Sequence, residues 1–333
     1  MREPLLSRWA RRAISFPLQP AGLALCLLLL PLAAPLLLAR DLVARTRLAG
    51  LRLWLLLMGY FAAETAGLVL AALLWGVTLG GLLRAASLRW HYALQRRWVG
   101  ALWLLARGLY GLRLEVEGAE GLADPAPVLV LARHASVADV LLPALLLSRP
   151  HGTRLRYVLK HELLWDPCLD LVGQRLPNVF VRRGSGRPEE QVARVRALAR
   201  ALGPGEGVLI YPEGTRFSPA RRERLLRELE RTGDAVGLAQ ARAFAHVLPP
   251  RPGGPVALLE ACPQADVVVL AHQGLEGSAT FASLWSGRFR GTVVRVRVTR
   301  WPAASVPRAP EAAWDWLLDR WREVDAWVGA EAE

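Results

Sequence analysis

The chain has 333 residues, of which 53% are hydrophobic, and a formal net charge of +13. Its three cysteines, Cys26, Cys168 and Cys262, are far apart and form no Cys-x-x-Cys pattern, which argues against a disulfide framework or a structural zinc site. Positive charge in a strongly apolar chain favours attachment to an anionic membrane, and no nucleic-acid recognition motif accompanies the arginines.

Two long apolar runs lie near the N-terminus. Residues 22–39 carry no charge, and residues 53–83 carry only Glu64. Each run is long enough to enter or cross a bilayer as a helix, so we predict a tail and two membrane segments over residues 1–83, folded as a hairpin. Arginine clusters on both sides of the first run leave two topologies open, a spanning hairpin and one that enters and leaves on the cytoplasmic face. We expect Glu64 to lie near the membrane interface or beside an arginine. A cleaved signal peptide fits less well, because a second apolar run follows without a clear cleavage site.

The chain changes character after these runs. Residues 84–112 mix arginine and tryptophan with apolar residues at helical spacing, which is typical of an amphipathic helix on a membrane surface. Residues 113–333 alternate short apolar runs with turns and helical patterns, which indicates an α/β domain with a mixed, mostly parallel sheet flanked by helices. Strands are expected at Arg113–Glu117, Val128–Ala132, Arg156–Leu159, Val179–Arg182, Val208–Tyr211, Val267–Ala271 and Thr292–Thr299. Helices are expected at Ala138–Leu147, Glu189–Leu202, Pro219–Arg231, Gly254–Ala261 and Ala312–Val328. The last helix is amphipathic, so it should dock on the domain or on lipid.

A histidine and an aspartate follow the predicted strand 128–132. They are His134 and Asp139, and they would lie at the carboxyl end of that strand, where open α/β sheets place their active sites. A neutral imidazole can take the proton of a hydroxyl as its oxygen attacks a thioester. A carboxylate on the other ring nitrogen fixes the tautomer, so His134 could be a base and Asp139 its partner. The alternative is that Asp139 only stabilises the start of a helix.

A second polar cluster follows the predicted strand 208–211. Glu213, Gly214, Thr215 and Arg216 form a turn that would expose backbone N–H groups, a hydroxyl and a guanidinium together. Such a cluster suits a phosphate group, because arginine can bind two phosphate oxygens at once. The alternative is an exposed turn with a surface Glu/Arg pair that contributes little to stability.

In combination, these motifs resemble the glycerolipid acyltransferase family, which includes the 1-acylglycerol-3-phosphate acyltransferases. His134-x-x-x-x-Asp139 resembles the first block of that family, and the turn 213–216 resembles the third. Pro177–Arg183 resembles the second block, with a proline where the family has glycine. Val247–Gly254 resembles the fourth block, in a form closer to the branch of the lysocardiolipin acyltransferases.

The resemblance implies roles for single residues. His134 would be the general base, oriented by Asp139. The acceptor would be bound by Arg183, Glu213, Gly214, Thr215 and Arg216. Lys160 follows a strand and is a second-rank phosphate contact or an ordinary surface lysine. We expect the remaining histidines, His272 among them, to be structural or surface residues, because none has a carboxylate partner at useful spacing.

The resemblance also implies a reaction. A fatty acyl group would pass directly from acyl-CoA or acyl-carrier protein to the free hydroxyl of a lysophospholipid, first of all 1-acylglycerol 3-phosphate, without a metal, a prosthetic group or an acyl-enzyme. Other acceptors remain alternatives, namely a lysocardiolipin-type lipid, glycerol 3-phosphate or an aminoacyl lysolipid. A non-catalytic protein that binds anionic lipid is a further alternative. We expect an integral or re-entrant membrane protein with its active site on the cytoplasmic face and no nucleic-acid partner.

Overall fold

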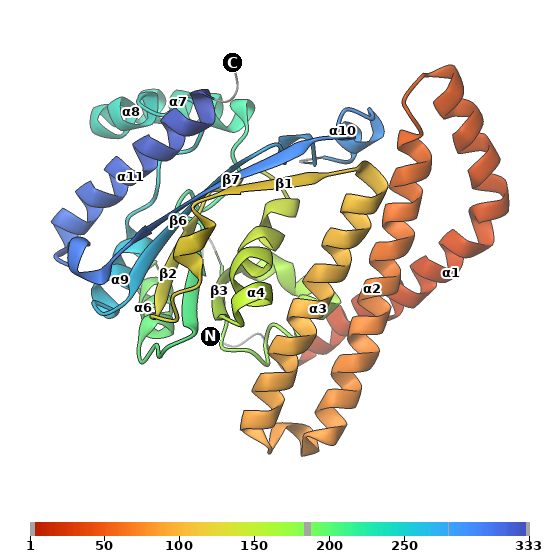
Figure 1. Cartoon of the computed structure of the whole chain (residues 1–333), viewed down its shortest axis with the longest axis horizontal. Helices are drawn as coiled ribbons and strands as arrows, with labels where there is room; N and C mark the ends of the chain where they lie inside the picture. Colours follow the sequence, from red (N-terminus) through yellow and green to blue (C-terminus); the bar gives the residue numbers. More distant parts are fainter. Residues whose placement is uncertain (1–3, 183–187, 279, 331–333) are drawn as a thin grey trace. The chain divides into compact units, whose positions relative to one another are not determined.

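The computed structural model describes residues 4–182, 188–278 and 280–330, and the chain divides into two compact units (Figure 1). Unit 1 comprises Met1–Arg113, Leu159–Arg182 and Thr280–Thr292, and unit 2 comprises Leu114–Val158, Arg183–Ala279 and Val293–Glu333. Two segments of the predicted domain 113–333, Leu159–Arg182 and Thr280–Thr292, belong to unit 1 in this division, and the predicted domain bounds stay a prediction.

Unit 1 is mainly helical. Its helices are α1 (Leu5–Val43), α2 (Ala49–Val77), α3 (Arg84–Tyr110), α5 (Pro167–Leu171) and α10 (Phe281–Trp285), with 3₁₀ turns η1 (Leu79–Gly81) and η5 (His161–Trp165). Both α1 and α2 are long and apolar enough to cross a membrane. In Figure 1, α1 and α3 each run alongside α2.

Two helix boundaries in unit 1 differ from the predicted membrane segments. The first helix starts at Leu5, ahead of the predicted membrane segment 22–39, and ion pairs join its first turns to α5. Arg11 Nη1 lies 2.9 Å from Asp170 Oδ2, and Arg12 Nε lies 2.7 Å from the same oxygen. The second helix ends at Val77 instead of residue 83, because two glycines with positive φ follow it.

Glu64 lies in the middle of α2 and is fully buried. Its Oε2 accepts a hydrogen bond of 3.1 Å from the backbone N–H of Cys168 in the first turn of α5. The first N–H groups of a helix have no partner within the helix, so a carboxylate is a suitable acceptor for them. Among the described residues Glu64 thus contacts the start of α5 and not an arginine, while its expected place near the membrane interface stays a prediction.

The seven strands form one mixed sheet in the order β1-β7-β6-β2-β5-β3-β4. They are β1 (Arg113–Glu117), β2 (Val128–Ala132), β3 (Arg154–Lys160), β4 (Val179–Val181), β5 (Glu206–Ile210), β6 (Asp266–Gln273) and β7 (Val293–Trp301). The central strands β6, β2, β5 and β3 are parallel, and β7 is antiparallel to β6. Every residue of β2 is buried, as expected for a parallel strand covered on both faces. This arrangement confirms the predicted mixed, mostly parallel sheet.

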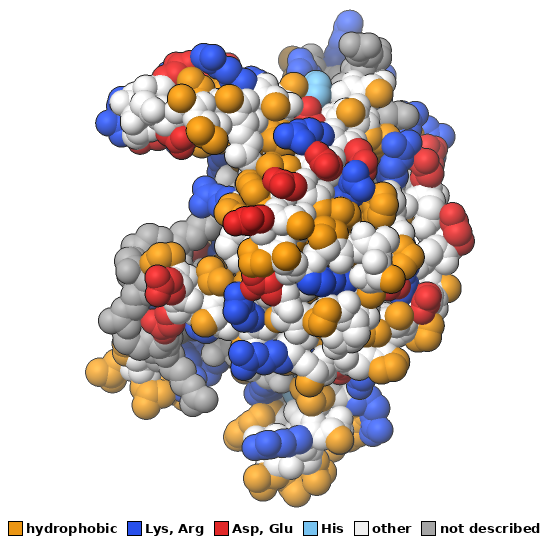
Figure 2. Space-filling view, turned by 90° about the vertical axis from the view of Figure 1, so that its left-hand side faces the viewer, with side chains coloured by type: hydrophobic (Ala, Val, Ile, Leu, Met, Phe, Trp, Pro, Cys, Tyr) orange, Lys and Arg blue, Asp and Glu red, His pale blue; other side chains and the backbone are white. Residues whose placement is uncertain are grey.

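Helices cover the sheet of unit 2. They are α4 (Arg149–His151), α6 (Pro188–Ala199), α7 (Pro219–Thr232), α8 (Ala235–Arg242), α9 (Gly253–Ala261) and α11 (Pro310–Ala330). The C-terminal α11 packs on β6 and α9, so it docks on the domain. Seen from the α11 side, acidic and basic side chains are interspersed with apolar ones (Figure 2).

The predicted helix Ala138–Leu147 is irregular in the structure. A 3₁₀ turn, η3 (Ala138–Leu141), is followed by a π-helical turn, η4 (Ala144–Ser148). Pro143 lies between them, and it has no N–H to donate to the carbonyl of Asp139, which a regular helix requires. The loop that carries His134 therefore continues into a short turn instead of a long helix.

Candidate active site

The His134 loop, residues 133–139, follows the carboxyl end of β2. His134 Nδ1 lies 2.9 Å from Asp139 Oδ1, so the two predicted residues are in hydrogen-bonding contact. Asp139 Oδ2 accepts from the backbone N–H groups of Ala135 (2.6 Å) and Ser136 (2.7 Å). The aspartate thus folds its own loop and binds the imidazole with the same carboxylate.

The His134 ring is also held from the side. The ring centroid of Tyr211, which follows β5, lies 4.5 Å from that of His134, with an angle of 33° between the planes. Because Asp139 can only accept, His134 Nδ1 carries the hydrogen and Nε2 is left with a lone pair. The imidazole is therefore prepared to take a proton at Nε2.

Burial of Asp139 disfavours its charged form, whereas the hydrogen bonds that it accepts favour that form. Burial alone would raise its pKa, whereas the bonds from His134 and His272 lower it, and the pKa lies well below its ordinary value. Asp139 is therefore ionised, as a partner that stabilises an imidazolium must be.

Glu213 links two of the sequence blocks through its side chain. It is 1% exposed, and its oxygens accept from the backbone N–H groups of His134 and Leu248, each at 2.9 Å. Burial raises its pKa to about 8, although the two N–H bonds lower it. The carboxyl group of Glu213 holds the framework of the site, and its expected contact with an acceptor stays a prediction.

The rest of the Glu213 turn, residues 213–216, is more open. Gly214 adopts a positive φ of 70° and donates its N–H to Tyr211 O at 2.9 Å, which shapes the turn. Thr215 and Arg216 are half-buried, and within the described residues neither side chain forms a hydrogen bond or an ion pair. The backbone N–H of Phe217 donates to His134 O at 2.6 Å, so this turn is joined to the His134 loop.

The fourth block is joined to the same site. Besides the bond from Leu248 to Glu213, the backbone N–H of Arg251 donates to Pro212 O at 2.9 Å. Asp325 of α11 holds the preceding segment, since its Oδ1 accepts from the backbone N–H groups of His246 (2.6 Å) and Val247 (2.9 Å). Three segments that are distant in sequence thus meet in unit 2.

Two predicted site residues are not tested by this geometry. Arg183 lies outside the described residues. Lys160 ends β3, is half-buried and belongs to unit 1. Their expected roles in phosphate binding stay predictions.

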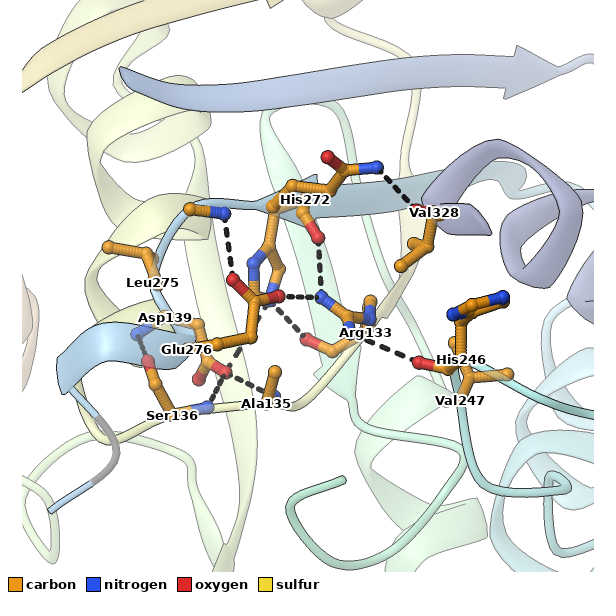
Figure 3. Close-up of polar contacts among 12 residues, drawn as sticks. Arg133, Ala135, Ser136, Asp139, His246, Val247, His272, Leu275, Glu276 and Val328 are labelled. Carbon is orange, nitrogen blue, oxygen red and sulfur yellow. Dashed lines mark hydrogen bonds and ion pairs between the residues drawn. The ribbon is translucent and has the colours of Figure 1, made fainter. Parts of the chain in front are cut away.

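The structure adds residues that the sequence reasoning missed. His272 is buried at the end of β6, with Nε2 3.4 Å from Asp139 Oδ2 (Figure 3). It therefore has a carboxylate partner, contrary to the expectation. Arg133 is also buried and donates to Glu276 Oε1 at 2.6 Å. The sequence offered one signal for His272. It is a histidine at the carboxyl end of an apolar strand, and the residues at the carboxyl ends of parallel strands lie close together.

One comparison with known protein families bears on this site. Residues 113–253 match the family model described as Acyltransferase. The region that holds the His134 loop, the Glu213 turn and the Leu248 segment is therefore acyltransferase-like. The chain is also similar to the crystal structure of the 1-acyl-sn-glycerophosphate (LPA) acyltransferase, PlsC, from Thermotoga maritima, with 15% identity over 82% of this chain and 96% of that one and a TM-score of 0.47.

Proposed function

We propose that the protein transfers a fatty acyl group from acyl-CoA or acyl-carrier protein to the free hydroxyl of a lysophospholipid, with 1-acylglycerol 3-phosphate as the acceptor and phosphatidic acid as the product. The contact between His134 Nδ1 and Asp139 Oδ1, inside an acyltransferase-like region, carries the proposal. It supplies a base with its tautomer fixed and its second nitrogen free.

The reaction then needs two proton transfers. The acceptor oxygen attacks the carbonyl carbon of the thioester while its hydroxyl proton passes to His134 Nε2. The tetrahedral intermediate collapses with cleavage of the C–S bond, and the thiolate takes the proton back from His134. Asp139 stabilises the imidazolium between these steps. The residues need no metal, no prosthetic group and no covalent acyl-enzyme for this route.

The Glu213 turn supports a phosphate-bearing acceptor. Arg216 is half-buried and pairs with no carboxylate in the described parts of the chain, so its guanidinium is available to an anion. Arginine binds phosphate through two parallel N–H bonds, which fixes orientation as well as charge. Arg183 and Lys160 are proposed as further contacts, on the resemblance alone.

The apolar helices of unit 1 support a location at the membrane. We propose that α1 and α2, which are long and apolar enough to cross a membrane, enter and leave the bilayer on the cytoplasmic face as a re-entrant hairpin. This topology would leave the arginine clusters on both sides of the first apolar run in the cytoplasm. The active site would then face the cytoplasmic leaflet.

An assay of membranes that contain the full chain tests this function. Transfer from radiolabelled acyl-CoA and acyl-carrier protein would be measured with 1-acylglycerol 3-phosphate, glycerol 3-phosphate, lysocardiolipin and an aminoacyl lysolipid, in wild type and His134→Ala. We expect phosphatidic acid from the wild type only. Product from another acceptor would identify that lipid as the substrate instead. If no combination of donor and acceptor gives product while the protein still binds anionic vesicles, the non-catalytic alternative is favoured.

A further inference from the structure

The carboxylate of Asp139 is shared by two histidines from different strands. Its Oδ1 binds His134 Nδ1. Its Oδ2 lies 3.4 Å from Nε2 of His272, and Figure 3 shows these two side chains together. The imidazole of His272 is fully buried, with 1% of the residue exposed. A buried ring in this position has no solvent to bond to, so neighbouring protein atoms must satisfy its hydrogen-bonding groups.

The neighbours fix the tautomer of His272. Besides Asp139 Oδ2, its Nε2 lies 3.1 Å from the backbone carbonyl oxygen of Arg133. Both oxygens can only accept, so Nε2 must carry a hydrogen. Nδ1 is buried and has no hydrogen-bond partner among the described residues, so a second proton there would be unsatisfied. His272 is therefore a neutral donor, and it is not placed to act as a second base.

Arg133 and His272 are bonded to each other at the ends of β2 and β6, which are adjacent parallel strands. The guanidinium of Arg133 donates to the backbone oxygen of His272 at 2.6 Å, while the ring of His272 donates to the backbone oxygen of Arg133. The same guanidinium bonds to Glu276 Oε1 and to the backbone oxygen of His246, which fixes its position. This reciprocal contact sets the place where the chain leaves β2 and reaches His134.

We propose that His272 is a positioning residue for acyl transfer, which holds Asp139 by its Nε2–H group and keeps the carboxylate directed at His134. This inference rests on the proposed function of His134 and Asp139. Without the Nε2–H group, Asp139 would keep its two backbone donors but lose the side-chain donor from β6. The carboxylate would then be less fixed and more basic, and it would hold the proton on His134 more strongly.

The surroundings of the two rings make this effect specific. The charged or titratable groups that face His272 are Asp139 from the His134 loop, Arg133 from the end of β2 and Glu276 from the turn after β6. Glu213 contacts the backbone of His134 and Tyr211 packs on its ring. Replacing His272 keeps all of these groups in the chain, but it removes the ring's bond to the backbone oxygen of Arg133 together with its contact to Asp139.

Three variants of the full-length protein in detergent would test the role. His272→Leu removes the donor at similar volume, His272→Gln offers an amide N–H where Nε2 was, and His151→Gln is a control on the exposed α4. For His272→Leu we expect kcat to fall about tenfold, the effect of one hydrogen bond, with KM for both substrates nearly unchanged. The acid limb of the kcat/KM profile should move to higher pH. His272→Gln should restore most of the lost kcat and most of the shift in the pH profile. The control His151→Gln should match the wild type.

A second measurement does not depend on turnover. The pH dependence of carbethoxylation of His134 by diethyl pyrocarbonate, followed on its peptide by mass spectrometry, reports when the ring loses its proton. In His272→Leu the midpoint should move to higher pH, and in His272→Gln it should return. If His134 modification and kcat are the same in His272→Leu and the wild type, or if both variants lose activity equally without a shift in either profile, the inference is wrong. An inactive wild type with a shifted midpoint would instead reject the proposed function and keep the positioning role.

Discussion

The backbone N–H of His134 donates to Oε1 of Glu213 at 2.9 Å, so the two residues that start the first and third sequence blocks are in direct contact. The other oxygen of Glu213 accepts from Leu248 in the fourth block. One buried carboxyl group therefore joins three motifs. Its two oxygens accept hydrogen bonds from the backbone, which explains an acidic residue at a position that touches little solvent.

The buried position of Glu213 makes the free energy of unfolding of the protein depend on pH. The pKa of Glu213 is raised from 4.5 to about 8 in the folded protein, mainly by burial. Between these values the unfolded chain releases the proton while the folded protein keeps it, so the free energy of unfolding falls as pH rises from about 4.5 to about 8. The loss is at most about 5 kcal/mol, at about 1.4 kcal/mol per unit.

Glu213→Gln should remove this dependence. The variant is less stable at pH 5, by roughly 1–3 kcal/mol, because its amide NH₂ faces one of the two N–H donors. The wild type loses stability over this range and the variant does not, so the difference should shrink as pH rises and reverse in sign towards pH 8. Denaturant unfolding at both values measures it, and an equal difference at pH 5 and pH 8 would contradict a raised pKa.

Asp139→Asn should abolish most of the transferase activity. An amide cannot stabilise the imidazolium by charge, and it can hold His134 in the wrong tautomer, so we expect kcat to fall by about 10³-fold to 10⁴-fold. Asp319→Asn, on the exposed side of α11, is the control. A fall of less than tenfold with a normal melting temperature would rule out Asp139 as the partner of the base.

Arg216→Ala should weaken the binding of acceptors that carry a phosphate. Loss of a charge-assisted pair corresponds to about tenfold or more in KM for 1-acylglycerol 3-phosphate. KM for the acyl donor should stay the same, and Arg216→Lys should recover only part of the affinity because it offers no fork of donors. Arg224→Ala, on the exposed face of α7, serves as the matched arginine control. An unchanged acceptor KM would place the phosphate elsewhere.

Leu82 tests on which side of the membrane the connection between α2 and α3 lies. Figure 2 shows apolar and basic side chains at its lower end, where the connection of α2 and α3 lies, and Leu82 there is 80% exposed. We expect Leu82→Cys to react with a membrane-impermeant maleimide in inverted vesicles but not in spheroplasts, because the exposed Arg84 nearby keeps this connection in water on the cytoplasmic side. Val236→Cys, equally exposed on α8, should label in inverted vesicles. Labelling of Leu82→Cys from the outside would show that the hairpin crosses.

Local pattern was enough to predict several elements closely. The strand Val128–Ala132 and the start of α7 at Pro219 have the predicted bounds. The first is a continuous β-branched and leucine run, and the second begins after a serine cap and a proline at the first position, which are local signals. Elements shaped by distant partners were predicted less well. The start of α1 depends on Asp170, and the irregular turn after Asp139 depends on Pro143 together with bonds back to the loop.

The sequence by itself determined the apolar runs, the sheet-forming pattern and the pairing of His134 with Asp139, because these depend on composition or on residues a few positions apart. The tertiary structure decided that His272 shares Asp139, that Glu213 is buried between two blocks and that Glu64 bonds to the start of α5. These contacts join residues 35 to 133 positions apart in the chain, as Glu213 and Leu248 or Asp139 and His272 show. The contacts of His272 and Glu213 form because β2, β5 and β6 are neighbours in the sheet. The bond of Glu64 forms because α2 packs on α5, where a buried polar group must find a partner.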